Sequence, residues 1–197
     1  MASAGTTELF NVAVGRDAMG RIETRTEVED HVSKVWSYRY DLAGRLERVL
    51  VDDVVVESFA YDDNDNRLSR TTPSGSETAT YDAQDRLLSY GGKTFRHDAN
   101  GRRLEMTEGG ATTRYTYDVF GALSGVALPS GRVLTYELDA LGRPVGKRSD
   151  GVRVQSWLWS DQQKLVAELD AAGNVVMRFI YGTKSNVPEY VVRGGRT

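Results

Sequence analysis

Cysteine is absent from the sequence, which excludes disulfides, thiol nucleophiles and thiolate metal sites. Long apolar runs are absent too, because none approaches the roughly 20 residues that a membrane-spanning helix needs. The first ten residues, MASAGTTELF, lack the apolar centre of a signal peptide. We therefore expect neither a membrane span nor an export signal within this chain.

Residues and motifs typical of catalytic sites are equally scarce. His31 and His97 are the only histidines, and the sequence contains no glycine-rich phosphate loop and no serine nucleophile elbow. The 25 basic and 28 acidic residues are interspersed, so no basic cluster suggests a nucleic-acid site. We predict a protein that is not an enzyme, with no cofactor, no bound metal and no nucleic-acid partner.

A short motif of the type Tyr-Asp-x-x-Gly-Arg-Leu recurs along the chain. Between residues 40 and 138 its copies start 16 to 21 residues apart. A fixed period of this size is typical of repeat proteins. The copies are RDAMGRI from Arg16, YDLAGRL from Tyr40, YDDNDNRL from Tyr61, YDAQDRL from Tyr81, HDANGRRL from His97, YDVFGAL from Tyr117, LDALGRP from Leu138 and LDAAGNV from Leu169, with a degraded copy, WSDQQKL, from Trp159.

Each unit contains a second turn signal about midway between two copies of the motif. The signals begin at Pro73, Gly91, Glu108, Pro129 and Ser149. The segments between turns alternate with the period of a strand, as in Arg114-Tyr115-Thr116-Tyr117. Two strands for each of eight units give about 16 strands, and we predict an all-β fold in which β-hairpin repeats form a continuous antiparallel meander. A twisted sheet of that width tends to curl, so we expect a curled or spiralling strip.

The aspartate and glycine of the motif predict its turn chemistry. The Asp carboxylate can accept backbone N–H groups within the turn. The glycine three residues later allows the positive φ that closes the turn, and Asp65 and Asp85 are the tolerated substitutes. The predicted turn residues are Asp17, Gly20, Asp41, Gly44, Asp62, Asp82, Asp98, Gly101, Asp118, Gly121, Asp139, Gly142, Asp170 and Gly173.

The residue before the Asp and the residue two positions earlier share one face of a strand. Stacked along the sheet, they predict an aromatic stripe made of Tyr38, Tyr40, Phe59, Tyr61, Tyr81, Phe95, Tyr115, Tyr117 and Tyr136. We expect apolar residues after each turn to pack against this stripe, namely Leu46, Leu68, Leu87, Leu104 and Leu123. Arginine should lie over the stripe or pair with the turn carboxylates.

Three groups of residues have a second interpretation. His97 occupies the Tyr position of its repeat, so we interpret it as a stripe residue rather than a base or a ligand. The acidic segment 62–66 suggests calcium, but an EF-hand reading would need Gly at Arg67 and Glu at Pro73, so a turn is favoured. The tryptophans Trp36, Trp157 and Trp159 lie in strand patterns, which favours packing over ligand stacking.

The eight units, four of which begin with Tyr-Asp, resemble the YD-repeat (Rhs-repeat) family, which includes bacterial Rhs and polymorphic toxin proteins, cocoon subunits of toxin complexes, and teneurins. The resemblance covers roughly residues 12–190. It implies a β-strip wound into a hollow shell that encloses a toxin or an unfolded cargo. The segment YGTKSNVPEYVV from Tyr181 resembles the linker toward the Rhs-associated core, and that core has no counterpart in this sequence. We therefore expect a lead-in at 1–11, YD repeats at 12–180 and a linker at 181–197.

The resemblance implies that the chain is a structural segment of a shell that encapsulates the C-terminal toxin of a secreted or cell-surface bacterial protein. Its partners would be the rest of the shell and the enclosed domain. The alternative is an adhesion module that binds carbohydrate or protein through exposed aromatic side chains. Unpaired edge strands also predict edge-to-edge self-association.

Overall fold

The structure, a computed structural model, describes residues 10–184 and 186–194, and these residues form strands and turns. The chain divides into two compact units, Met1–Gly92 and Lys93–Thr197. Among the described residues, no helix is long and apolar enough to cross a membrane. The structure thus gives two β units, each described by itself.

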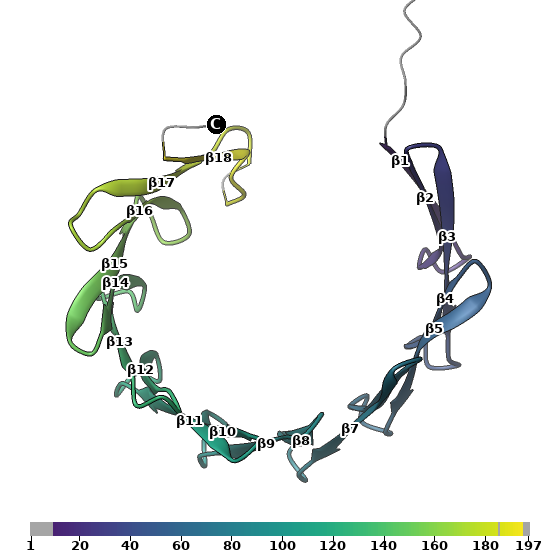
Figure 1. Cartoon of the computed structure of the whole chain (residues 1–197), viewed down its shortest axis with the longest axis horizontal. Helices are drawn as coiled ribbons and strands as arrows, with labels where there is room; N and C mark the ends of the chain where they lie inside the picture. Colours follow the sequence, from purple (N-terminus) through teal and green to yellow (C-terminus); the bar gives the residue numbers. More distant parts are fainter. Residues whose placement is uncertain (1–9, 185, 195–197) are drawn as a thin grey trace, which may run out of the picture. The chain divides into compact units, whose positions relative to one another are not determined.

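The first unit is an antiparallel meander of eight strands, each paired with its neighbour in the chain (Figure 1). Residues 1–9 of the expected lead-in lie outside the described part of the chain, and the first strand begins at Phe10. The strands are β1 (Phe10–Arg16), β2 (Ile22–Glu29), β3 (Val32–Tyr40), β4 (Leu46–Val51), β5 (Val54–Tyr61), β6 (Arg67–Thr72), β7 (Gly75–Tyr81) and β8 (Leu87–Tyr90).

The second unit continues the same pattern with ten strands paired in chain order. Its last strand lies within the predicted linker and pairs with the strand before it, so the boundary at residue 180 stays a prediction. The strands are β9 (Lys93–His97), β10 (Arg103–Glu108), β11 (Ala111–Tyr117), β12 (Leu123–Ala127), β13 (Val133–Leu138), β14 (Pro144–Ser149), β15 (Val152–Trp159), β16 (Leu165–Leu169), β17 (Val175–Ile180) and β18 (Tyr190–Arg193).

The predicted all-β antiparallel meander is confirmed. The described residues form 18 strands, more than the predicted number of about 16, because the degraded copy at Trp159 makes a turn between β15 and β16 and a further strand, β18, forms within the predicted linker. A weakened motif therefore still makes a hairpin.

Two kinds of turn alternate along each meander. Aspartate turns, which we define as the five-residue segments from the motif Asp, connect an odd-numbered strand to the next even-numbered one from β1 to β14. The intervening turns include two-residue turns with positive φ at both positions, as expected for hairpins that match the strand twist. These pairs are Asp30 and His31, Asp52 and Asp53, Gly91 and Gly92, Gly109 and Gly110, and Asp150 and Gly151. Within each unit, the aspartate turns between β1 and β14 therefore lie at the same end of the strands.

Asp170 departs from this alternation. Its turn connects β16 to β17, an even-numbered strand to an odd-numbered one. Because strand direction alternates in a meander, this turn lies at the opposite end of the strands from the turns of Asp98, Asp118 and Asp139. The repeat from Leu169 is thus out of phase with the others.

The hydrophobic core is thin in both units. The buried apolar residues are Val49, Ala79, Val126 and Ala167, and none of the described side chains is fully buried. A single sheet has no second layer to cover it, so side chains can be only partly shielded by their neighbours on the same face. Stability must therefore come from contacts between adjacent strands and turns.

Candidate functional site

The repeated joint between successive aspartate turns is the most regular arrangement of side chains in the structure. It begins with the Asp carboxylate. At Asp82, Oδ1 accepts the backbone N–H groups of Gln84 (2.9 Å) and Arg86 (3.1 Å). The hydrogen bond in which the backbone N–H of the residue four positions later donates to Asp Oδ1 also forms at other turns. These are the turns of Asp17, Asp41, Asp62, Asp98, Asp118, Asp139 and Asp170.

The residue three positions after the Asp closes each turn. Its N–H donates to the carbonyl of the Asp, as from Gly44 to Asp41 at 3.0 Å, and its φ is positive. The glycines at this position, Gly20, Gly44, Gly101, Gly121, Gly142 and Gly173, have φ between 75° and 87°. Asp65 (φ 67°) and Asp85 (φ 58°) take the same conformation, which Asp tolerates better than most residues.

The second carboxylate oxygen of the Asp usually binds an arginine. In the turn of Asp41, Oδ2 accepts a bond from Arg45 Nε at 2.8 Å. The backbone N–H and the guanidinium of Arg45 lower the pKa of Asp41 from its ordinary value of 3.8. The same pairs occur at Asp17–Arg21, Asp82–Arg86, Asp98–Arg102 and Asp139–Arg143.

Three turns differ at this arginine position. Asn66 and Asn174 each donate their side-chain amide to the turn carboxylate at 3.1 Å. The turn of Asp118 has Ala122 instead, so a side-chain donor is missing from that position. Turn closure therefore does not depend on the arginine.

The arginine also lies against the aromatic residue that immediately precedes the Asp of the next aspartate turn. The Arg45 guanidinium carbon is 4.9 Å from the centre of the Tyr61 ring. The Tyr61 hydroxyl donates to the carbonyl of Leu46, the first residue after the Arg45 turn, at 2.8 Å. We call this bond the inter-repeat hydrogen bond. It ties this turn to the next one.

Inter-repeat hydrogen bonds recur through both units, with lengths of 2.7–3.1 Å. Ring stacking of the arginine accompanies four of them, with Arg–centroid distances from 4.3 Å to 5.6 Å. The donors and acceptors are Tyr40 to Ile22, Tyr61 to Leu46, Tyr81 to Arg67, Tyr117 to Arg103, the indole N–H of Trp159 to Pro144, and Tyr181 to Leu165.

The bond is missing where another residue takes the aromatic position, as in the copies that begin at His97, Leu138 and Leu169. These three side chains are half-buried. His97 Nδ1 is buried without a hydrogen-bond partner among the described residues. Leu138 follows the one aspartate turn with Ala122 at the arginine position. The arginine and the aromatic ring are therefore absent from the same joint.

The second half of the predicted stripe consists of the residues two positions before each of these aromatic positions. Phe95 and Tyr115 lie on either side of Arg103, whose guanidinium carbon is 5.6 Å and 5.1 Å from their ring centres. Phe59 receives Arg67 in the same way, at 5.8 Å. Tyr38, Phe59, Phe95, Tyr115 and Tyr136 are all half-buried.

Two leucines expected beneath the stripe are displaced by one residue. The register pairs Tyr61 with Arg67 and His97 with Arg103, so Leu68 and Leu104 do not stand opposite the ring. Their motifs carry one additional residue between the turn and the leucine, which moves an arginine into the facing position. The expectation was therefore wrong for Leu68 and Leu104.

Sequence reasoning missed the donors Trp159 and Tyr181 and all the carbonyl acceptors. Trp159 stands in the Tyr position of the degraded copy, and in its turn Asp161 accepts the N–H groups of Gln163 and Lys164 at 2.9 Å and 2.8 Å. The spacing of the repeats could therefore have identified Trp159 as a donor. A backbone carbonyl has no signature in the sequence.

The acidic segment at residues 62–66 is used within the turns. Asp62 accepts from Asn64 and Asn66, and Asp65 pairs with Arg45 at 2.8 Å. The described residues include no group of three or more His, Asp or Glu placed to hold a metal ion.

The tryptophans lie half-buried within the sheets. Trp36 donates its indole N–H to Glu27 at 3.1 Å and carries Lys34 over its ring at 5.0 Å. Trp157 pairs in register with Glu168. The use of these residues for carbohydrate or protein recognition stays a prediction.

Comparison with known proteins identifies a family and finds relatives among bacterial nucleases and teneurins. The profile described as Teneurin YD-shell matches residues 2–197. The tRNA nuclease WapA of Bacillus subtilis is 33% identical over 109 residues, which are 52% of this chain and 4% of WapA. Teneurin-3 of Mus musculus is 29% identical over 149 residues, which are 72% of this chain and 5% of Teneurin-3.

Solved structures of toxin complexes share the fold. The Tc holotoxin pore of Photorhabdus luminescens superposes with a TM-score of 0.56 and 14% identity, over 88% of this chain and 13% of the other. A TcdB2–TccC3 structure without its hypervariable C-terminal region gives a TM-score of 0.52 and 13% identity, over 90% of this chain and 14% of the other. In each of these comparisons, this chain corresponds to a small part of a much longer polypeptide.

Proposed function

The chain belongs to the teneurin YD-shell family, and on that premise we propose that it forms part of a shell that encloses the toxin or effector domain of a larger, exported protein. The chain itself is a structural segment of the YD-shell type. The enclosed cargo, the export and the bacterial toxin setting are parts of the proposal.

The repeated inter-repeat hydrogen bond is the observation that carries this function. At most joints it holds one aspartate turn to the next without help from a second layer, so the sheet can be a single layer and still be ordered. A wall around a cargo needs that property, because a globular core would fill the enclosed space. The thin core, with four buried apolar residues, is consistent with such a wall.

Partial coverage of the relatives supports a segmental role. The chain spans 5% of Teneurin-3 and 13% of the toxin-complex chain. The strands β1 and β18 each pair with one other strand among the described residues, which leaves an edge where further strands can add. We propose that neighbouring repeats of the parent protein occupy these edges.

We also propose that the role is structural rather than catalytic. Paired carboxylates are typical of glycosidases, but the turn Asp carboxylates each accept backbone N–H groups inside their own turn. The pKa of Asp139 is lowered, and the Arg143 side chain is the main cause. Such a group is a poor proton donor at neutral pH.

Limited proteolysis of the longest natural polypeptide that contains these residues tests the proposal. In the intact protein, we expect the sequence that follows the shell to resist a protease that cleaves it readily when it is expressed alone. Replacing Tyr40, Tyr61 and Tyr117 by Phe removes three inter-repeat hydrogen bonds and should make the enclosed sequence cleavable.

The matched control is Leu138→Met, which alters the same motif position in a repeat that lacks the bond. It should leave protection unchanged. Equal cleavage of the following sequence in the intact protein and in the isolated domain would exclude encapsulation.

A further inference from the structure

One face of the second unit carries an excess of arginine. Residues paired in an antiparallel register project to the same side of the sheet, so the face can be followed from strand to strand. The pairs Arg96 with Glu105, Glu105 with Arg114, and Arg148 with Arg153 all lie on the side opposite the aromatic stripe. We call this side the arginine face, and its charged strand residues are Arg96, Glu105, Arg114, Glu137, Arg148, Arg153 and Arg178.

The first cluster on this face places one carboxylate between two guanidinium groups. Glu105 Oε2 is 3.1 Å from Arg96 Nε, and its Oε1 is 3.3 Å from Arg114 Nε. The two arginine side chains are 60% and 64% exposed, whereas that of Glu105 is 27% exposed. The cluster thus has one excess positive charge and presents it to solvent.

The second cluster repeats this arrangement across β13, β14 and β15. Glu137 Oε1 is 2.6 Å from Arg148 Nε, and its other oxygen pairs with Arg153. Gly146 stands between them on β14, paired with Glu137 in register, and a Cβ there would collide with the Glu137 carboxylate. The absence of a side chain at Gly146 lets Glu137 lie across the strand and reach Arg153.

The two carboxylates stay ionised at neutral pH and do not neutralise their clusters. A hydrogen bond from Arg96 lowers the pKa of Glu105, and one from Arg148 lowers the pKa of Glu137. Each cluster therefore contains two guanidinium charges and one carboxylate charge.

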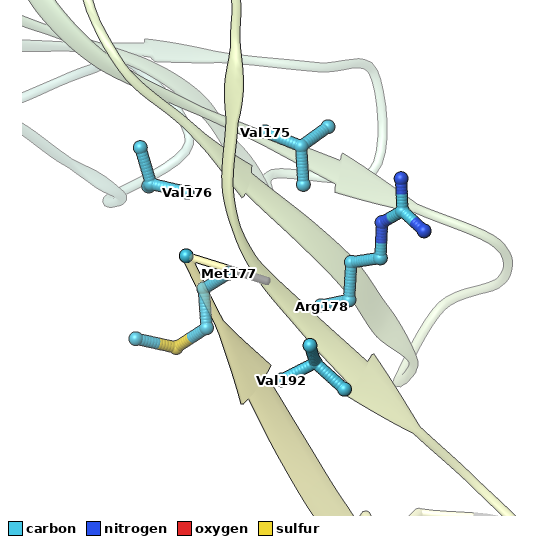
Figure 2. A pocket seen from close by; sticks show the side chains of 6 residues that line it. Val175, Val176, Met177, Arg178 and Val192 are labelled. Carbon is cyan, nitrogen blue, oxygen red and sulfur yellow. The ribbon is translucent and has the colours of Figure 1, made fainter. Parts of the chain in front are cut away.

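Arg178 extends the face toward the end of the unit. It pairs in register with Ala167 and Val192, and Figure 2 shows its side chain on the same side of β17 as Val175 and Val192, with Met177 on the other side. It has no ion-pair partner among the described residues. A pocket of about 180 Å³ adjoins it, lined by Val175, Val176, Met177, Val192 and Gly194.

The remaining strand residues of the face are mostly small or hydroxylated. Thr94, Thr107, Thr112, Thr116, Thr135 and Ser156 follow from the same register. They offer hydrogen-bond donors and acceptors. Val133, Leu158 and Tyr190 add exposed apolar surface to the same face. Five arginines against two glutamates leave a net charge of +3 on a face of a chain whose total charge is −3.

We propose that the arginine face binds an acidic polypeptide segment in extended conformation. The occupant follows from charge complementarity, because fixed guanidinium groups bind carboxylates in preference to other side chains. From β10 to β13 the clusters are three strands apart, or about 14 Å at ~4.8 Å per strand. An extended chain rises ~3.3 Å per residue, so carboxylates about four residues apart would meet successive clusters.

Only the source of the acidic segment rests on the proposed shell function, under which it is part of the enclosed cargo. Binding itself is a property of this chain. A failure to bind would leave the encapsulation test untouched, and a failure of encapsulation would leave the binding result standing.

Fluorescence anisotropy with a labelled 15-residue poly-glutamate peptide tests the inference on the full chain. We expect saturable binding with one peptide per chain, weakened by salt as charge pairs become screened. The double variant Arg114→Gln with Arg153→Gln should weaken binding about tenfold, while Arg96 and Arg148 keep Glu105 and Glu137 paired.

The matched control removes two positive charges from the opposite face, as Lys93→Gln with Lys147→Gln. It should change the affinity less than about twofold. Arg114→Lys with Arg153→Lys keeps the charge and should retain most of the binding, which guards against loss by misfolding. Absence of binding by the native chain, or an equal loss in both glutamine variants, would overturn the proposal.

Discussion

The joint at Tyr61 and the joint at Leu138 follow the same kind of turn but hold the next repeat differently. Before Tyr61, Arg45 binds the Asp41 carboxylate and stacks on the ring, and the Tyr61 hydroxyl reaches the Leu46 carbonyl. Before Leu138, Ala122 follows an Asp118 turn that closes with the same backbone bonds but has neither arginine nor ring hydroxyl. Turn closure and repeat-to-repeat attachment are therefore separate functions of the motif, made by different residues.

Removing the ring from the complete joint should have the largest effect. Tyr61→Ala eliminates a half-buried ring, its arginine contact and its hydrogen bond, and we expect about 3 kcal/mol of lost stability in urea denaturation. Leu138→Ala is the matched change in the incomplete joint and should cost about 1–2 kcal/mol. Equal costs would mean that the joint adds nothing beyond apolar burial.

A change at the turn itself tests closure independently of the joint. Gly121 has φ 87°, so Gly121→Val forces a β-branched residue into a left-handed conformation and should cost about 2 kcal/mol. Gly121→Asn, which tolerates that conformation, should cost clearly less. The measurement is the shift in thermal unfolding midpoint, and an unchanged midpoint for the valine variant would contradict the turn geometry.

Building the missing joint sharpens the comparison. Ala122→Arg together with Leu138→Tyr supplies the absent arginine and hydroxyl, and the nearest equivalent acceptor is the Leu123 carbonyl. We expect the double variant to gain about 1 kcal/mol, with each single variant gaining less than half of that. Purely additive effects in this double-mutant cycle would show that the two residues do not act as a unit.

The smallest effect concerns the charge of one turn carboxylate. The Arg143 side chain lowers the pKa of Asp139 below its ordinary 3.8, so the ionised Asp favours the folded state. Its contribution is complete above pH 3.8 and is lost as the pH falls through the lower folded-state value. Urea titrations between pH 5 and 2 should show a shallower acid loss for Asp139→Asn than for the native chain, and parallel curves would contradict this assignment.

Local interactions explain how much of the fold the sequence could reveal. An Asp and a Gly three residues apart determine a turn by bonds within five residues, so turn and strand positions were predictable from spacing alone. The aromatic positions before the aspartate turns followed from strand periodicity in the same way. The inter-repeat hydrogen bond did not, because its acceptor is a backbone carbonyl 14 to 18 residues away.

Features that depend on the number of strands or on their register could not be predicted from the motif. The turn of Asp170 has the same local bonds as the other aspartate turns. Its place at the opposite end of the strands depends on the number of strands that precede it. The one-residue displacement of Leu68 and Leu104 likewise arises from register, which a motif read by itself does not contain.

Pairing between chain neighbours has a consequence for how the protein folds. Among the described strands, each pair within a unit joins strands that follow each other in the sequence, so strand pairing does not wait for a distant part of the chain. Low sequence separation lowers the entropic cost of closing each contact and favours fast folding. We therefore expect each unit to assemble progressively, one hairpin upon the last, with a stability that rises with the number of repeats, as in a one-dimensional chain of coupled elements.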